Sequence, residues 1–330
     1  MTPTLPETLG VSAQDVLDAG HRLKGLVVTT PLVESPLLNA SIGGRLLVKA
    51  ECLQRTGSFK MRGATNALAQ MDDTARARGV ITHSSGNHGQ ALASAARAFG
   101  LRATVVMPDD APALKIELTR AHGAEVVFCP RHAREQTVAR LAAESGAVVI
   151  HPYETPAVIA GQGTVGLEIV EQCAAASVVP DQVLVCCGGG GLTAGVALAI
   201  DRLLPGVPVI AVEPDGWDDT KRSLAAGTLV ANDGLTATAC DALQAMCPGT
   251  LSFSLNRALL AGAVSVDEAM VRHAMRQAFV HLKLVAEPGG AVALAAALAG
   301  KVETADRLSV VVLSGGNVDP GRFASVLAGD

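Results

Sequence analysis

The sequence predicts an α/β protein with mainly parallel sheets. Short runs of β-branched and other apolar residues alternate, along a chain of 330 residues, with alanine-rich segments of helical period. Most of these runs are apolar throughout, which is typical of parallel strands that helices cover on both faces. The chain contains no internal repeat, low-complexity tract or Ser/Gly linker, so that two domains, if present, must be interwoven.

Seven segments are predicted to be strands because each is a short apolar run bounded by polar residues, glycine or proline. In chain order they are residues 46–50, 103–107, 125–129, 147–150, 183–187, 207–212 and 309–313. Helices are expected between them, and three have a readable start. Ser12 and Asp15 suit a capping box, Pro112 suits a first helical turn, and Pro288 opens the alanine-rich stretch 289–299.

The composition favours a protein that acts on small molecules. A net charge of −5 argues against nucleic-acid or anionic-membrane partners, and aromatic residues make up only 2% of the chain. No apolar run reaches the ~20 residues of a membrane span, and residues 1–10 lack the pattern of a signal or transit peptide. Seven cysteines without a C-x-x-C motif indicate buried thiols in a reducing compartment. We therefore expect a soluble, cytoplasmic protein.

A run of four glycines follows the predicted strand 183–187 and precedes a helix that we expect to start near Leu192. Backbone N–H groups in such a run can converge on a phosphate at the positive end of the helix. The run lacks the Gly-Lys-Ser/Thr of a P-loop. It also satisfies a dinucleotide pattern, with Glu213 at the end of the next strand, so a dinucleotide-binding oxidoreductase is one alternative. A glycine-rich turn without a ligand is another.

Lys60 provides an amine that can form a Schiff base. Ser58 can cap a helix whose first turn carries Lys60, and the positive end of that helix disfavours the protonated amine. A Schiff-base lysine needs such an effect, since its pKa must fall from ~10.4 toward roughly 7–8. An amine of this kind and a phosphate-binding loop are the two attachments that pyridoxal phosphate requires. The alternative for Lys60 is an ordinary solvated surface charge.

The polar loop 83–90 ends in an alanine-rich helix. It contains Ser84, Ser85, Asn87 and His88, whose hydroxyls, amide and imidazole lie near free backbone N–H groups. Such a loop can receive a carboxylate and a phenolic oxygen. A capped helix start after a strand explains it equally well.

In order, these segments resemble the β-family of pyridoxal-phosphate enzymes, also called fold type II, in its serine racemase and threonine/serine or 3-hydroxyaspartate dehydratase branch. The resemblance covers about residues 25–320 and rests on segments 57–64, 84–90, 156–164, 188–192, 212–214, 287–290 and 314–317. It implies two doubly wound domains with the cofactor in the cleft between them. A small mobile domain, residues 76–154, would be inserted in a large domain, residues 1–75 plus 155–330. A homodimer is also implied.

The resemblance implies cofactor-binding roles for the matching residues. Lys60 would hold the cofactor and exchange the α-proton of the substrate, Phe59 would lie near the ring, and Asn87 would bind the phenolic oxygen. Glu287 would belong to the same pocket, and Ser314 would face the pyridine nitrogen. The phosphate would be bound by the amides of Gly188, Gly189, Gly190, Gly191 and Leu192.

The predicted reaction is elimination. A hydroxyl such as that of Ser314 cannot hold a full positive charge on the ring nitrogen, which favours loss of a β-leaving group over transamination. A β-hydroxy amino acid (serine, threonine or 3-hydroxyaspartate) would lose water and give a 2-oxo acid and ammonia. The best enzymatic rival is a cysteine synthase-like β-replacement enzyme of the same superfamily.

Substrate contacts are implied for Ser84, Ser85, Asn87 and His88. Ser85 resembles a serine that faces the substrate from the side opposite the lysine, so racemisation is possible, and Ser85→Ala should abolish it while sparing elimination. Arg134 falls where an arginine of that branch approaches dicarboxylates and could pair with a β-carboxylate. A solvent-facing helix residue is the alternative for Arg134.

A divalent cation is implied near the end of the predicted strand 207–212. Glu213 and Asp219, with the backbone carbonyl of Trp217, resemble the cation site of the family. Hard oxygen ligands suit magnesium or calcium. The alternative is a solvated acidic helix start.

Overall fold

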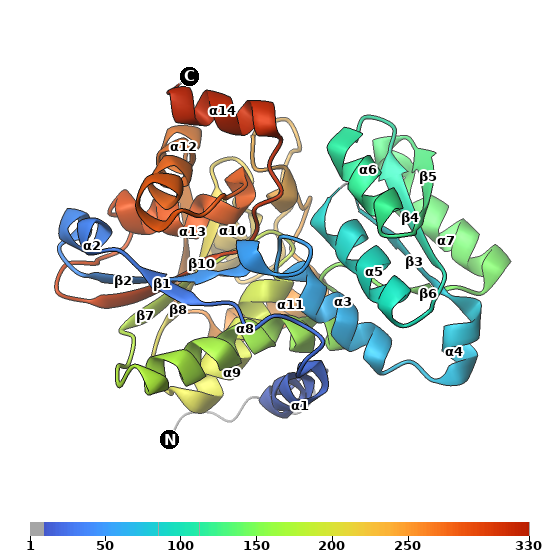
Figure 1. Cartoon of the computed structure of the whole chain (residues 1–330), viewed down its shortest axis with the longest axis horizontal. Helices are drawn as coiled ribbons and strands as arrows, with labels where there is room; N and C mark the ends of the chain where they lie inside the picture. The colour runs from blue at the N-terminus through green and yellow to red at the C-terminus, as the bar shows by residue number, and fades with distance from the viewer. Residues whose placement is uncertain (1–9, 85, 112, 330) are drawn as a thin grey trace.

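The chain folds into two lobes, each built on its own sheet (Figure 1). The structure is a computed structural model and describes residues 10–84, 86–111 and 113–329. Ser85 and Pro112 lie outside the described residues, so our expectations for them have no structural counterpart. None of the described helices is long and apolar enough to cross a membrane.

The large lobe contains a six-stranded sheet. Its strands lie in the order β1-β2-β10-β7-β8-β9, and among the described residues every neighbouring pair is parallel except β1 with β2. The strands are β1 (Leu32–Glu34), β2 (Arg45–Ala50), β7 (Gln182–Cys186), β8 (Val209–Pro214), β9 (Gly262–Val266) and β10 (Leu308–Leu313).

Helices cover both faces of this sheet, as the apolar strands require. Val183 and Val185 of β7 pack toward one group of helices, while Leu184 and Cys186 pack toward the other, because side chains alternate along a strand. The first group includes α1 (Ala13–Leu23), α8 (Pro156–Ala175), α9 (Gly191–Leu203) and α11 (Thr250–Leu259). The second includes α2 (Pro36–Ile42), α12 (Glu268–Gln277), α13 (Pro288–Leu298) and α14 (Pro320–Ala328). Helix α10 (Asp219–Ala226) follows β8.

The small lobe has a four-stranded sheet in the order β5-β4-β3-β6, parallel throughout. Its strands are β3 (Val80–His83), β4 (Ala103–Pro108), β5 (Glu125–Cys129) and β6 (Val148–Val149). Its helices are α4 (Asp73–Arg78), α5 (Asn87–Ala98), α6 (Ala113–Ala121) and α7 (Arg134–Ser145). The sheet lies inside the range 76–154 that we assigned to an inserted domain. The boundaries themselves stay a proposal.

The fold class and the seven predicted strands are confirmed, with ends that shift by at most two residues. Three strands were missed: β1 has only three residues, β9 contains glycine and serine, and β3 continues directly into a polar loop. The capping box is present, since the Asp15 carboxylate accepts from the Ser12 amide at 2.8 Å. Pro288 is the first residue of α13, as expected.

Candidate active site

A cavity of about 320 Å³ lies between the two lobes and collects most of the side chains that the sequence singled out. It is at the carboxyl ends of β7, β10 and β3, where open α/β sheets bind ligands. The predicted residues that line it are Phe59, Lys60, Ser84, Asn87, His88, Arg134, Gly188, Gly189, Gly190, Gly191, Leu192, Glu287 and Ser314.

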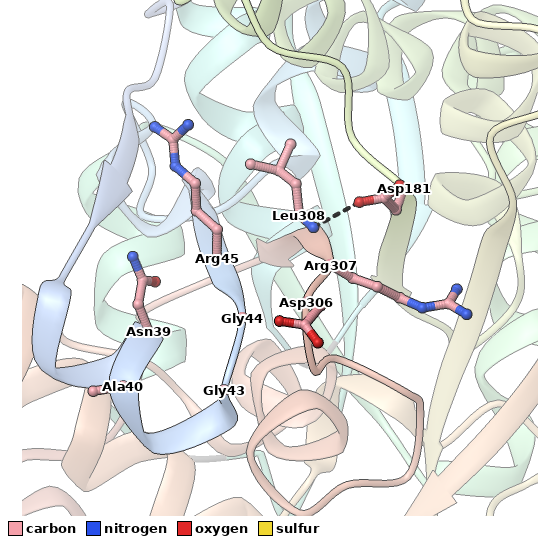
Figure 2. Close-up of a pocket in the computed structure, with 9 residues that line it drawn as sticks. All are labelled: Asn39, Ala40, Gly43, Gly44, Arg45, Asp181, Asp306, Arg307 and Leu308. Carbon is pink, nitrogen blue, oxygen red and sulfur yellow. Dashed lines mark hydrogen bonds between the residues drawn. The ribbon is translucent and has the colours of Figure 1, made fainter.

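A second hollow, of about 610 Å³, lies at the opposite ends of the large-lobe strands (Figure 2). Arg45, Arg307 and Asp181 line it, and the Asp181 carboxylate accepts from the Leu308 amide at 2.7 Å. The guanidinium of Arg45 pairs with Glu34. Because ligands of parallel sheets bind at the carboxyl ends of strands, the smaller interlobe cavity is the candidate active site.

Lys60 is the first residue of α3 (Lys60–Ala69), and its amine lies in the cavity. The Nζ atom donates to the Pro152 carbonyl at 2.9 Å and lies 5.1 Å from the centre of the Phe59 ring. Burial lowers the pKa of Lys60 from its ordinary value to about 8. A substantial fraction of this amine is therefore neutral near physiological pH.

The expected cap by Ser58 is wrong. Phe59 occupies the N-cap position of α3, and no side chain caps the helix. Ser58 instead pairs with Gly315 in an isolated antiparallel bridge, and its buried hydroxyl has no hydrogen-bond partner. The Phe59 amide donates to the Ser314 carbonyl at 3.1 Å. Burial, rather than a capped helix end, therefore accounts for the low pKa of Lys60.

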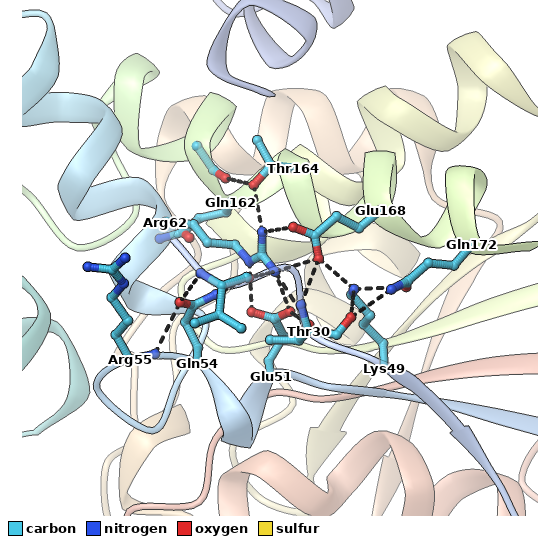
Figure 3. Close-up of polar contacts among 12 residues, drawn as sticks. Thr30, Lys49, Glu51, Gln54, Arg55, Arg62, Gln162, Thr164, Glu168 and Gln172 are labelled. Atoms are coloured by element: carbon cyan, nitrogen blue, oxygen red, sulfur yellow. Dashed lines mark hydrogen bonds and ion pairs between the residues drawn. The ribbon is translucent and has the colours of Figure 1, made fainter. Parts of the chain in front are cut away.

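Arg62 follows Lys60 by two residues in the first turn of α3, so the two side chains leave opposite sides of the helix. Figure 3 shows the polar contacts that hold Arg62. Its guanidinium is fully buried and donates to Glu51 at 2.7–2.8 Å and to Glu168 at 2.6–2.8 Å. Lys49, also fully buried, donates to Glu168 at 2.6 Å. Two cations and two carboxylates thus form a neutral network that joins α3 to α8 and β2.

The glycine loop is held from outside the cavity. Ser252 Oγ and the Gly249 amide donate to the Gly189 carbonyl at 2.6 and 3.2 Å, and Asn256 donates to the Gly190 carbonyl at 3.2 Å. Among the described residues, the amides of Gly188 to Gly190 donate no hydrogen bond. A side chain on Gly189 would overlap the Tyr153 ring, so that the loop must be glycine here. Free amides before a helix suit a phosphate.

Asn87, the first residue of α5, joins the two lobes. Its Nδ2 donates to the Glu287 carboxylate, and its Oδ1 accepts from Asn317 at 2.8 Å. Glu287 is 1% exposed, and one of its oxygens has no partner. Burial raises the pKa of Glu287 to about 7. Ser314, at the end of β10, lies in the same cavity. The unpaired Glu287 oxygen, together with the Asn87 amide and the Ser314 hydroxyl, fits a polar, ring-shaped cofactor.

The expected substrate-binding residues lie on the small-lobe side. The Ser84 hydroxyl accepts from the Gly86 amide at 3.1 Å. The His88 ring lies 3.1 Å from the Ile150 carbonyl, and burial keeps its pKa well below the ordinary value, so the imidazole is neutral. Arg134 begins α7 and donates to the Arg131 carbonyl at 2.8 Å. In the described part of the chain no carboxylate pairs with Arg134.

Three charged cavity residues escaped the sequence reasoning: Lys115, Glu135 and Asp241. His151, which directly precedes the cavity residues Pro152 and Tyr153, was missed as well. His151 follows the predicted strand 147–150, and its place at a strand end was an available signal. Its ring packs edge-on against His83 and Tyr153, with ring centres 5.5 and 4.6 Å apart. Burial lowers the pKa of His151 to about 4. No motif marks Lys115 or Asp241.

The predicted cation ligands lie outside this cavity. Glu213 accepts from the Thr220 and Lys221 amides at 2.9 and 2.8 Å, while Asp219 has one oxygen bound to Asn232 at 2.8 Å and one buried oxygen without a partner. Burial raises the pKa of Glu213 to about 8 and that of Asp219 to about 6. No cluster of three or more His, Cys, Asp or Glu side chains suits a metal within the described ranges. The unpaired Asp219 oxygen and the two carboxylates nevertheless fit a cation that takes backbone oxygens as further ligands.

Comparisons with known proteins agree with this geometry. The family model described as "Pyridoxal-phosphate dependent enzyme" matches residues 23–315. The L-threo-3-hydroxyaspartate ammonia-lyase of Saccharomyces cerevisiae is 39% identical over 96% of this chain and 96% of its own length. A serine racemase of Arabidopsis thaliana is 39% identical, with 94% and 95% covered. The crystal structure of a threonine deaminase from T.th. superposes with a TM-score of 0.89 at 41% identity, covering 93% of this chain and 99% of that one.

Proposed function

The chain belongs to the pyridoxal-phosphate dependent enzyme family, and we propose that it is an ammonia-lyase that eliminates water from a β-hydroxy amino acid. The observation that carries the proposal is one cavity in which a lysine of lowered pKa faces a glycine loop with free amides. The comparisons favour this interpretation over a dinucleotide-binding oxidoreductase.

The cofactor would be held at three places. The amides of Gly188 to Leu192 would bind its phosphate, Lys60 would bind its aldehyde carbon, and Ser314 would donate to or accept from its ring nitrogen. Asn87, which Glu287 and Asn317 already orient, would bind the phenolic oxygen. Phe59 would pack beside the ring, because its backbone is bonded to Ser314.

Bound pyridoxal phosphate supplies an electron sink that makes the α-proton of an amino acid acidic. Lys60, whose pKa of about 8 leaves a large share of the amine neutral at that pH, can take that proton at Nζ. The neutral imidazoles of His83 and His88 in the cavity wall, and of His151 packed against His83, add no competing positive charge. Ser84 and the amides of loop 83–88 would bind the α-carboxylate, and closure of the small lobe would exclude water.

We propose 3-hydroxyaspartate as a preferred substrate, with serine and threonine as further ones. Arg134 lines the cavity without a carboxylate partner among the described residues, and burial lowers its pKa. The Arg134 guanidinium is half-buried, and it can pair with a carboxylate through two hydrogen bonds. The β-carboxylate of 3-hydroxyaspartate supplies such a partner. The yeast relative is named for the threo isomer of this compound.

Ser85 and the cation site complete the proposal. Ser85, although outside the described residues, would act as the proton carrier on the face opposite Lys60 and permit racemisation. The parent should convert L-serine to D-serine. Loss of this conversion in Ser85→Ala, with elimination retained, would support this role. A magnesium or calcium ion would bind Glu213, Asp219 and the Trp217 carbonyl.

A homodimer is proposed as well. Leu53 and Val285 are 50% and 41% exposed, and the two segments meet at Gly316, where an added methyl would come 2.6 Å from the Val285 carbonyl and 3.1 Å from Cys52. Adjacent exposed apolar side chains are typical of subunit contacts. Light scattering on the purified protein should give twice the mass of the chain.

The direct test is to incubate the purified protein with threo-3-hydroxyaspartate, threonine or serine and to measure ammonia and 2-oxo acid. We expect stoichiometric ammonia, and no product from Lys60→Ala. The same purified protein should absorb in the near-visible range, and borohydride should abolish this band. Absence of the band, or ammonia release that survives Lys60→Ala, would overturn the proposal. Addition of sulfide should not divert the product, which separates elimination from β-replacement.

A further inference from the structure

Lys115 and Asp241 form an ion pair that crosses the cavity between the lobes. Lys115 belongs to α6 of the small lobe and is 7% exposed, while Asp241 begins the short helix η4 (Asp241–Leu243) of the large lobe. Among the ion pairs of the described residues, this pair alone joins the two lobes. Both side chains line the cavity.

The pair lies between the two loops to which we assign substrate and phosphate. A methyl on Gly86, in the loop proposed to bind the α-carboxylate, would come 3.3 Å from Lys115 Nζ. On the other side, a methyl on Gly188 would come 3.2 Å from Leu243, two residues beyond Asp241. The Lys115 ammonium is therefore within reach of a carboxylate that enters the cavity at Gly86.

A carboxylate that replaces Asp241 makes the same kind of bond to Lys115. A buried ammonium without a partner is costly, so Lys115 needs a carboxylate in the free enzyme and in the complex alike. Exchange of one carboxylate for another avoids that cost, because the cation stays paired throughout. Asp241 is only partly buried and can turn toward solvent when released.

We propose that Lys115 binds the α-carboxylate of the substrate and that the Asp241 carboxylate pairs with Lys115 in the substrate-free enzyme. The proposal rests on the proposed function, since it names a binding residue of that same site. Asp241 then acts as an internal competitor of the substrate. Its release also frees η4 from the small lobe, so that binding of the carboxylate is coupled to the position of the cavity wall.

If Asp241 competes with the substrate, substitution of Asp241 and substitution of Lys115 should change the affinity for a carboxylate in opposite directions. Asp241→Asn should strengthen carboxylate binding, and Lys115→Gln should weaken it, each by about tenfold, as expected for one charge-assisted hydrogen bond. The probe is propionate, a carboxylate without an amino group. Its dissociation constant is measured on the holoenzyme by ligand-observed NMR. Asp110→Asn, which breaks the exposed pair of Asp110 with Arg131, is the matched control and should leave the constant unchanged within twofold.

Equal weakening of propionate binding by Asp241→Asn and Lys115→Gln would overturn the proposal, because the ion pair would then only stabilise the structure of the cavity wall. No change in either variant would overturn it too, because Lys115 would then lie out of reach of the carboxylate. Propionate binding requires no turnover. A protein that binds propionate as proposed yet releases no ammonia would refute the proposed function and leave the role of Lys115 standing.

Discussion

Replacement of Arg62 by methionine tests how the fold holds Lys60 in place. The change keeps most of the side-chain volume but removes one of the two cations from the network of Lys49, Glu51, Arg62 and Glu168, and leaves a net charge of −1. Glu51, fully buried, keeps only the Thr30 hydroxyl among its close side-chain partners. Loss of one partner from a buried ion pair costs about 3–5 kcal/mol of unfolding free energy.

The expected fall in melting temperature follows from the size of the chain. At ~2.1 cal/mol/K per residue, unfolding of 330 residues carries an entropy of about 0.7 kcal/mol/K, so the loss corresponds to about 4–7 °C. Calorimetry of the cofactor-loaded protein measures it. The control is Arg140→Met, which breaks the exposed pair with Glu144 on α7 and should cost under about 1 kcal/mol.

The pH dependence of the melting temperature tests independently whether Arg62 stabilises the charged form of Glu51. Burial opposes ionisation of Glu51, but the Arg62 guanidinium outweighs it and holds the pKa of Glu51 below its usual value. This carboxylate therefore contributes stability above pH ~4.5, which is lost as the pH falls further. Without Arg62 the pKa of Glu51 rises, so the variant should be most destabilised at pH 7–8 and less so at pH 5. A melting temperature within 1 °C of the parent at pH 7.5, or a deficit that grows toward pH 5, would refute the reasoning.

Three further predictions concern the site. The rate at which the cofactor-free protein captures pyridoxal phosphate should rise with pH and level off above about 8, since the folded Lys60 loses its proton there; a rise that continues toward pH 10 would contradict the buried environment of the amine. Arg134→Gln should lower kcat/KM for 3-hydroxyaspartate by about 10–100-fold and leave threonine within about threefold, as expected for loss of a charge-assisted hydrogen bond, with Arg140→Gln on the same helix as control. Millimolar magnesium should raise the melting temperature of the parent but not that of Asp219→Asn. At a hundredfold excess over Kd, binding adds about 2.7 kcal/mol to the free energy of unfolding. An equal response of both proteins would show that the cation does not bind at Asp219.

The sequence predicted those features that depend on short-range chemistry. Gly190 has a φ of +92°, and the run of glycines before α9 is readable because only glycine adopts this conformation freely. Ser58 was misread because its partner is Gly315, more than 250 residues away, and pairing with that segment overrides local capping. Lys115 and Asp241 were missed for the same reason: they are 126 residues apart, and neither lies in a recognisable motif.

Helix α3 contacts the two lobes in different ways. Met61, Ala64 and Leu68 form an apolar stripe on α3 that packs in the core of the small lobe. Arg62 and Gly63, on another face, are bound to α8 of the large lobe, where Gly63 donates to Gln162 at 3.1 Å and Arg62 to Glu168. Apolar contacts are non-directional and tolerate small shifts, whereas a buried ionic network is fixed in distance and angle. We therefore propose that the small lobe slides over α3 as it closes on a substrate, while Lys60 keeps its position relative to the glycine loop and Ser314. It follows that substitutions in the stripe should alter substrate affinity, and substitutions in the network should alter capture of the cofactor.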